Sequence, residues 1–141
     1  MICPASLIGN WAKEISERTE FPICRLHGPG REAELRLWMQ NGGVAVTSYA
    51  TLKRLDSVRQ IQKDLLVVDE AHYVKNPEAN RSIYVQRQIA SSERVVLMTG
   101  TPLENNAREF IHLIRLCDPS VAERLNARST IPQAKCGGAL P

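Results

Sequence analysis

The sequence of 141 residues lacks several features that would place it in a narrow class of protein. Its cysteines include no CxxC pair, which favours reduced intracellular thiols over a disulfide framework or a zinc site; they are Cys3, Cys24, Cys117 and Cys136. No apolar stretch approaches the roughly 20 residues of a membrane span, and the start has no signal-peptide pattern. A net charge of +3 is too small to indicate a nucleic-acid partner by itself. The length suits one globular domain.

Short aliphatic segments alternate with longer amphipathic ones along the chain. The aliphatic segments predict five strands, at residues 1–4, 21–28, 44–49, 64–70 and 94–102. The segments between and after them predict helices at 6–19, 31–40, 51–62, 78–90 and 105–119. This alternation is typical of βαβ units, and near-continuous aliphatic strands are typical of a parallel sheet covered on both faces. Residues 119–141 are interpreted as an irregular C-terminal tail, because the preceding helix is expected to stop near Pro119.

Helical spacing predicts which side chains face the core. Ser6 is a candidate N-cap for the first helix. The expected core positions of the helices are Leu7, Trp11, Ile15, Leu52, Leu55, Ile83, Ile89, Phe110, Leu113, Ile114 and Leu116.

Polar residues gather where two of the predicted strands end. Asp69 and Glu70 follow one aliphatic strand, while Thr99, Gly100 and Thr101 follow another. Because ligands bind outside the carboxyl ends of parallel strands, these groups are expected to share a crevice. A tandem Asp and Glu there suits metal-assisted phosphoryl transfer, with the Asp near magnesium and the Glu orienting a water. Alone, each segment has a plainer interpretation, since "DEAH" can be a helix N-terminus with Asp69 as its cap and "TGTP" an ordinary turn.

Five motifs in order resemble the Swi/Snf-type ATPases of helicase superfamily two. "VVDEAHYVKN" with "VVLMTGTPLEN" is similar to motifs II and III, "CPASLIGNWAKE" to motif Ia, "VTSYATL" to motif Ib, and "HGPGR" to the turn after the next strand. Lys75-Asn76-Pro77 resembles the Swi/Snf branch in particular. The resemblance covers residues 2 to 118 and implies a three-layer, RecA-like α/β fold, a parallel sheet with helices on both faces. Residues 1–118 would be part of the first RecA-like, ATP-binding lobe.

The resemblance also implies roles for individual residues. Asp69 would be the magnesium-side carboxylate, acting through water, and Glu70 the catalytic base. His72 would link the nucleotide site to Thr99, Gly100 and Thr101, which would couple nucleotide state to DNA. The residues implied to face the DNA backbone are Ser6, Asn10, Thr47, Ser48 and Tyr49. Hydroxyl and amide donors suit phosphate contacts that position a duplex without reading its sequence. Trp11 is interpreted as a core residue.

The sequence departs from this family in one respect that bears on catalysis. A Walker A loop needs a Gly-rich turn followed by Lys and Thr or Ser, yet no Gly-Lys-Thr or Gly-Lys-Ser occurs. We therefore expect an incomplete lobe, without the Walker A strand, loop and helix and without the second RecA-like lobe. ATP and magnesium would serve the complete motor, and neither is expected to bind this chain tightly. Losing a central strand would leave an exposed sheet edge.

Three interpretations stay open on the sequence alone. The chain belongs to a DNA-dependent ATPase that translocates on duplex DNA and remodels nucleoprotein, or to a truncated paralogue that serves as a non-catalytic DNA-binding or scaffold module. A gene remnant is the third, favoured by the unpatterned tail. The expected partners are the backbone of double-stranded DNA and a second lobe, with no membrane. The expected location is intracellular, in cytoplasm, nucleoid or nucleus.

Overall fold

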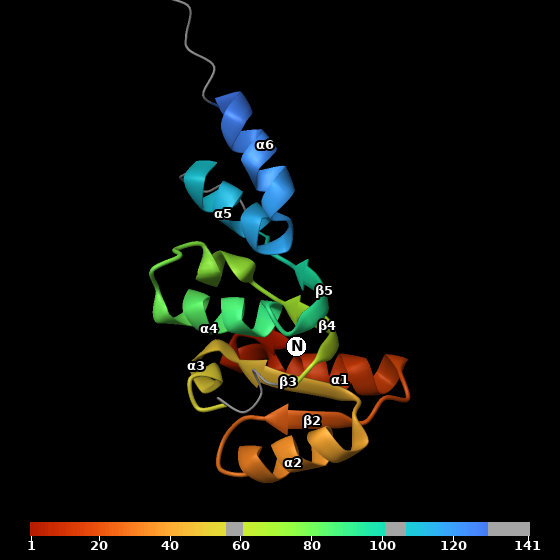
Figure 1. Cartoon of the computed structure of the whole chain (residues 1–141). Helices are drawn as coiled ribbons and strands as arrows, with labels where there is room; N and C mark the ends of the chain where they lie inside the picture. The colour runs from red at the N-terminus through yellow and green to blue at the C-terminus, as the bar shows by residue number, and fades with distance from the viewer. Residues whose placement is uncertain (56–60, 101–106, 130–141) are drawn as a thin grey trace, which may run out of the picture.

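The computed structural model describes residues 1–55, 61–100 and 107–129 and contains a five-stranded, wholly parallel sheet (Figure 1). The strand order is β2-β3-β1-β4-β5. The strands are β1 (Ile2–Cys3), β2 (Ile23–Leu26), β3 (Val44–Ser48), β4 (Lys63–Val68) and β5 (Ser92–Leu97). The predicted fold class, a parallel α/β sheet with helices on both faces, is confirmed. β5 lies at one end of this strand order.

Helices connect the strands and cover the sheet unequally. The helical elements are η1 (Ala5–Leu7), α1 (Ile8–Arg18), α2 (Arg31–Asn41), α3 (Tyr49–Leu52), η3 (Ala71–Val74), α4 (Asn80–Ile89), α5 (Ala107–Cys117) and α6 (Pro119–Ser129). α1 packs on one face, where Ile8 meets Cys3 and Val46 in a buried cluster. α2, α4 and α5 contribute to clusters on the opposite face. No described helix is long and apolar enough to cross a membrane.

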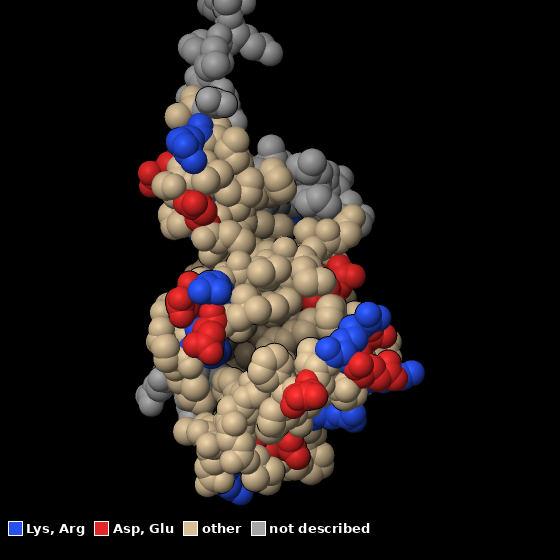
Figure 2. Space-filling view, turned by 90° about the vertical axis from the view of Figure 1, so that its right-hand side faces the viewer, with Lys and Arg blue, Asp and Glu red and all other residues tan. Residues whose placement is uncertain are grey.

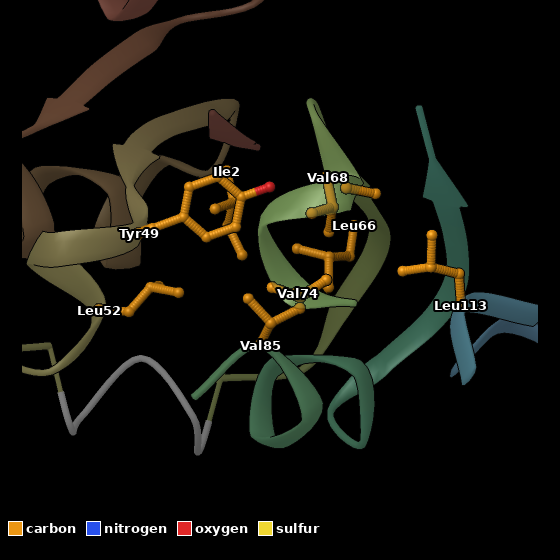
Figure 3. Close-up of a cluster of buried hydrophobic side chains, with 9 residues drawn as sticks. Ile2, Tyr49, Leu52, Leu66, Val68, Val74, Val85 and Leu113 are labelled. Carbon is orange, nitrogen blue, oxygen red and sulfur yellow. The ribbon is translucent and has the colours of Figure 1, made fainter. Parts of the chain in front are cut away.

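The largest core cluster surrounds the central strands β1 and β4. The register pairs Ile2 with both Thr47 and Val68, so these three side chains lie on the same face of the sheet. Figure 3 shows side chains from α3, η3, α4 and α5 gathered around this part of the sheet. The members are Ile2, Tyr49, Leu52, Leu66, Val68, Ala71, Val74, Val85 and Leu113. This cluster holds the segment that follows β4 against the sheet.

The other face of β4 and β5 is more open. Leu65 is 52% exposed and Val96 is 44% exposed, although both are aliphatic strand residues. Figure 2, which views the molecule from the side where these strands lie in Figure 1, shows a broad uncharged area across the middle. β5 is an edge strand of the described sheet, and exposed aliphatic residues beside such a strand favour aggregation.

The structure corrects the interpretation of residues 119–141 as irregular. Pro119–Ser129 form α6, which packs on α5. Asp118 caps this helix, because its Oδ1 accepts the backbone N–H of Ser120 at 2.9 Å and of Val121 at 3.2 Å. Pro119 is therefore a residue of the first helical turn, where its missing N–H costs nothing, and not only the end of α5. Residues 130–141 lie outside the described part.

Three local predictions were also wrong or only partly right. Ser6 makes no cap, because a 3-10 turn precedes α1 and Leu7 donates its N–H to the Pro4 carbonyl at 2.9 Å. Ile83 is 37% exposed, and Val85 takes the core position of α4 instead. The helix predicted for 51–62 is a single turn over Tyr49–Leu52, and residues 56–60 lie outside the described part.

Candidate functional site

Asp69 lies directly after β4 at the carboxyl edge of the sheet, and two donors hold its carboxylate. Oδ2 accepts the indole N–H of Trp11 at 2.8 Å, and Oδ1 accepts the backbone N–H of Glu70 at 2.9 Å. Its own N–H donates to the Ile2 carbonyl at 2.8 Å, which extends the parallel pairing of β4 with β1 by one residue. The carboxylate is therefore fixed by α1, by its neighbour and by the central strand.

Glu70 has a backbone conformation that side-chain-bearing residues rarely adopt. Its φ of 52° and ψ of 50° place it in the left-handed region, and it is the one non-glycine residue with positive φ in the described ranges. Such strain costs about 1–3 kcal/mol and persists where the surrounding structure imposes it. Here the buried η3 residues Ala71 and Val74 anchor the segment that follows. The left-handed turn directs the chain from β4 into η3 within one residue.

His72 links Glu70 to the end of β5. Its Nδ1 lies 3.1 Å from Glu70 Oε2 and 3.5 Å from the Thr99 hydroxyl. With hydrogen on Nδ1, the ring donates to the carboxylate and the Thr99 oxygen is at the outer limit of hydrogen-bond distance. The side chains of Glu70 and His72 are 37% and 32% exposed, so they are accessible from solvent. The structure thus brings together the predicted Asp69, Glu70, His72 and Thr99 at one edge.

Tyr49 supports this edge from beneath. Its hydroxyl donates to the Asp69 carbonyl at 2.5 Å and lies 3.3 Å from the Glu70 carbonyl. Burial, and then the charge of Asp69, raises the pKa of the Tyr49 phenol above its ordinary value, so the donor keeps its proton. Its ring stacks on Tyr73 with centroids 5.5 Å apart, and the Arg81 guanidinium lies 5.5 Å from the Tyr73 centroid. Tyr49 is only 9% exposed.

Thr47 and Ser48, the other two residues predicted at the end of β3, are also buried. The Thr47 hydroxyl donates to the Leu26 carbonyl at 2.9 Å. The Ser48 hydroxyl lies 2.8 Å from that of Thr51 and 3.4 Å from His27 Nδ1. Exposures of 6% and 1% leave neither hydroxyl facing solvent in this conformation. The two hydroxyls therefore bind the segments that follow β2 and β3 to each other at this edge of the sheet.

Ser6 and Asn10 lie on the elements that follow β1, and both are exposed. Asn10 also lines a pocket of about 330 Å³ along α1, together with Leu7, Trp11 and Ile15. Gly100 is exposed next to Thr99, whereas Thr101 lies outside the described residues. The predicted site residues in the described part therefore form three groups, one around Asp69, one buried at the end of β3 and one at the start of α1. Trp11 connects the first group with the last.

The oxygen donors at Asp69 fit a hydrated magnesium ion better than an ion enclosed by protein ligands. No group of three or more His, Cys, Asp or Glu side chains suited to a metal occurs in the described part. Magnesium needs only one or two carboxylates, because it keeps several of its waters. Each Asp69 oxygen accepts one hydrogen bond and retains acceptor capacity.

Sequence reasoning missed the second role of Trp11. The predicted core packing is correct, since the ring lies against the cluster of Cys3, Ile8 and Val46. The bond to Asp69 could not be predicted, because 58 residues separate the pair and only the sheet order brings them together. A half-buried tryptophan needs a partner for its N–H, which is the one signal the sequence carried.

Comparisons with known proteins identify the family of the chain. The SNF2-related domain family model matches residues 1–130. TATA-binding protein-associated factor mot1 of Aspergillus fumigatus is 33% identical over 122 residues, which cover 84% of this chain and 6% of the relative. DNA excision repair protein ERCC-6-like 2 of Mus musculus is 35% identical over 112 residues, which cover 78% of this chain and 7% of the relative. The chain thus spans a small part of each relative's length.

A solved structure shares the fold. The Sulfolobus solfataricus SWI2/SNF2 ATPase core in complex with double-stranded DNA superposes with a TM-score of 0.74 at 24% sequence identity. The match covers 89% of this chain and 26% of the solved one.

Proposed function

The chain belongs to the SNF2-related domain family of Swi/Snf-type, superfamily-two helicase-like proteins. From this premise we propose that it supplies the part of a DNA-dependent ATPase lobe that holds magnesium and orients the attacking water. The proposal rests on one observation: Asp69, Glu70, His72 and Thr99 lie close together at the carboxyl ends of β4 and β5. In the complete motor, magnesium and ATP would complete the site. Bound magnesium supplies charge neutralisation on phosphate oxygens.

Asp69 and Glu70 have different environments that suit different tasks. Asp69 is held by two donors, which keep its carboxylate in one orientation toward a hydrated cation. Within the described part of the chain, the Glu70 carboxylate contacts His72 and is partly exposed. It can therefore accept a proton from a water placed beside it. Asp69 would orient the cation's waters, and Glu70 would act as the base.

His72 and Thr99 would carry the state of this site to the following segment. A change in the protonation or position of Glu70 changes the acceptor nearest His72 Nδ1, which Thr99 also approaches. Thr99, Gly100 and Thr101 would pass that change toward the DNA-facing surface. Two discrete hydrogen-bond arrangements are the physical requirement for such coupling.

The DNA contacts would begin at the exposed Ser6 and Asn10. Their hydroxyl and amide groups can donate to phosphate oxygens, which positions a duplex but reads no base. The buried Thr47, Ser48 and Tyr49 would support this surface from within. The solved structure in complex with double-stranded DNA supports the choice of partner.

A second candidate is a non-catalytic DNA-binding or scaffold module. The observation that favours it is the absence of Gly-Lys-Thr and Gly-Lys-Ser from this sequence. The size and amino-terminal sequence of the native polypeptide distinguish the two functions. A longer product with a Walker A loop supports the motor, while a product of this length that binds DNA supports the module.

Magnesium titration followed by NMR tests the motor proposal on the chain itself. We expect magnesium to shift the Trp11 indole and Glu70 amide signals weakly, because both donate to Asp69. Asp69→Asn should abolish these shifts. Asp64→Asn, at an exposed position near the start of β4, is the matched control and should preserve them. Equal shifts in the Asp69 variant would contradict the assignment.

A further inference from the structure

A histidine of α5 is buried against η3, the turn that follows Glu70, and the candidate site does not use it. His112 is 9% exposed. Its neighbour Leu113 lies with Val74 in the largest core cluster (Figure 3), and α5 packs on η3. The sequence indicated no role for His112, because 38 positions separate it from Val74.

The Val74 carbonyl, at the end of η3, receives its hydrogen bonds from side chains of two other helices. The last carbonyls of a helix have no donor within that helix. The buried Ser82 hydroxyl of α4 lies 3.1 Å from the Val74 carbonyl oxygen and 2.5 Å from that of Asn76. A hydroxyl has one proton, and the shorter contact takes most of it. The His112 ring, which also bonds to the Val74 backbone, is therefore the main donor to this carbonyl.

Val74 is the far end of a turn whose near end is Glu70. The Ala71 N–H donates to the Met98 carbonyl at 2.8 Å, and the Tyr73 N–H donates to the Glu70 carbonyl at 3.0 Å. A left-handed residue such as Glu70 keeps its conformation only while the surrounding structure imposes it. By holding Val74, the His112 ring therefore helps to hold the backbone of Glu70.

The place that His112 occupies suits the neutral ring. Nε2 is buried and has no hydrogen-bond partner within the described residues, whereas an imidazolium has two N–H groups to satisfy. Burial, and then the charge of Arg115, lowers the pKa of His112 below its ordinary value of 6.5, while the bond with Val74 acts in the opposite direction. A protonated ring is therefore more stable in water than beneath η3.

The charges around His112 leave this conclusion unchanged. Arg115 is the one charged group that shifts the pKa of His112, and it lies on the same helix. The elements packed on α5 are η3, β5 and α6. Their titratable or charged side chains in the described part are His72, Tyr73, Glu93, Arg94, Glu123 and Arg124. None of these contributes to the shift, so no carboxylate stabilises a charged His112 ring.

We propose that neutral His112 is a positioning residue for the turn that carries Glu70 and His72, and that protonation of the ring releases this turn from α5. The chain would then hold Glu70 in place above the pH at which His112 takes a proton and free it below. The meaning of this release for catalysis rests on the proposed function. The release itself is a property of the chain alone.

Amide hydrogen exchange measured between pH 7 and pH 5 tests the proposal. We expect the protection of the Ala71 and Tyr73 amides to fall below pH 6.5, by at most about tenfold per pH unit. The Val44 amide, which donates to the Pro22 carbonyl at 2.7 Å on the far side of the sheet, should keep its protection. His112→Gln, which can still donate to Val74 but cannot titrate, should abolish the pH dependence.

The other two histidines of the chain provide matched controls. His27→Gln removes an imidazole that contacts Thr51, and His72→Gln removes the one that contacts Glu70. Both variants should keep the loss of protection in acid, because both retain His112. In these variants the NMR signal of the His112 ring can also be assigned, and its titration should give a pKa below 6.5. This measurement needs no change at position 112, so it remains informative if His112→Gln fails to fold.

The possible results separate this inference from the proposed function. The same acid dependence in His112→Gln, or a ring that titrates at or above pH 6.5, overturns the inference. An equal loss of protection at Val44 also overturns it, because His112 would then support the whole fold and not this turn. None of these measurements contains magnesium, nucleotide or DNA, so their failure leaves the proposed function to the magnesium titration.

Discussion

The indole N–H of Trp11 donates to Oδ2 of Asp69 over 2.8 Å, and this bond joins α1 to the end of β4. Ser6 and Asn10 stand on the same stretch as Trp11, so the bond connects the surface proposed for DNA with the carboxylate proposed for magnesium. The Trp11 ring is packed against Cys3, Ile8 and Val46, which limits its movement. A shift of α1 would therefore be transmitted to the Asp69 carboxylate.

Replacing Trp11 by Phe should destabilise the chain more than replacing Trp38 by Phe. Both changes keep an aromatic ring and remove one indole donor. The Trp11 donor serves a carboxylate, and such bonds contribute about 1.5–3 kcal/mol to the free energy of unfolding. The Trp38 donor serves the Gly43 carbonyl at 3.0 Å in an exposed setting, for which about 0.5–1 kcal/mol is expected. Urea unfolding measures both, and equal losses would contradict a special role for the Trp11 bond.

The Glu70→Gly variant of the chain should be more stable than the Glu70→Ala variant. Both variants remove the carboxylate, but only Gly adopts a φ of 52° without steric cost. Relief of the left-handed conformation predicts a gain of about 1–2 kcal/mol for Glu70→Gly over Glu70→Ala in chemical denaturation. At Glu14, in the middle of α1, the order should reverse by about 1 kcal/mol. If Gly and Ala are equivalent at position 70, the backbone strain is absent in solution.

The elements that sequence predicts well are those set by short-range patterns. Aliphatic runs located all five strands, and helical spacing found Leu7 of η1 and Ile15 of α1 as partly buried residues on the core side. The tandem Asp69 and Glu70 stood at the predicted strand end. These features depend on residues within one turn or strand of each other, so the chain displays them directly.

The features that sequence missed depend on which segments meet in space. Strand order decides that Trp11 reaches Asp69, and no local pattern encodes it. Thr47 and Ser48 looked like surface donors, but β3 is covered on both faces, so their hydroxyls turn inward. Pro119 was interpreted as a stop signal because its role as a first-turn residue depends on Asp118 as a cap. Likewise, His27, Arg31 and Arg54 line one pocket although they follow two different strands, β2 and β3.

The chain should lose stability in alkaline solution through Cys3. Burial, and then the charge of Asp69, raises the pKa of the Cys3 thiol from 9.0 to about 11. Above pH 9 the unfolded thiol ionises while the folded one keeps its proton, so the free energy of unfolding falls as pH rises. The loss is at most about 1.4 kcal/mol per pH unit between the two pKa values. Cys3→Ala should show a shallower fall between pH 9 and 11, whatever its stability at neutral pH. An identical slope would rule out this contribution.

Two neighbouring residues of β4 should differ in how much stability the same substitution costs. Leu66 is 3% exposed within the core, so Leu66→Thr should cost about 2–5 kcal/mol in urea unfolding. Leu65 is 52% exposed on the opposite face, so Leu65→Thr should cost less than about 1 kcal/mol. The Leu65→Thr variant should also aggregate only at a higher protein concentration, as detected by light scattering, because it lacks an apolar side chain next to the edge strand. A large loss of stability in the Leu65 variant would mean that this face is covered in solution.

The chain as given should release no phosphate from ATP at a rate that DNA stimulates. Asp69 and Glu70 can orient a cation and a water, but positioning the phosphates requires a Gly-rich loop with its Lys, and the sequence contains no Gly-Lys-Thr or Gly-Lys-Ser. Phosphate release should therefore be the same for the wild-type chain and for Glu70→Gln, with and without duplex DNA. DNA-stimulated release that disappears in Glu70→Gln would contradict this prediction.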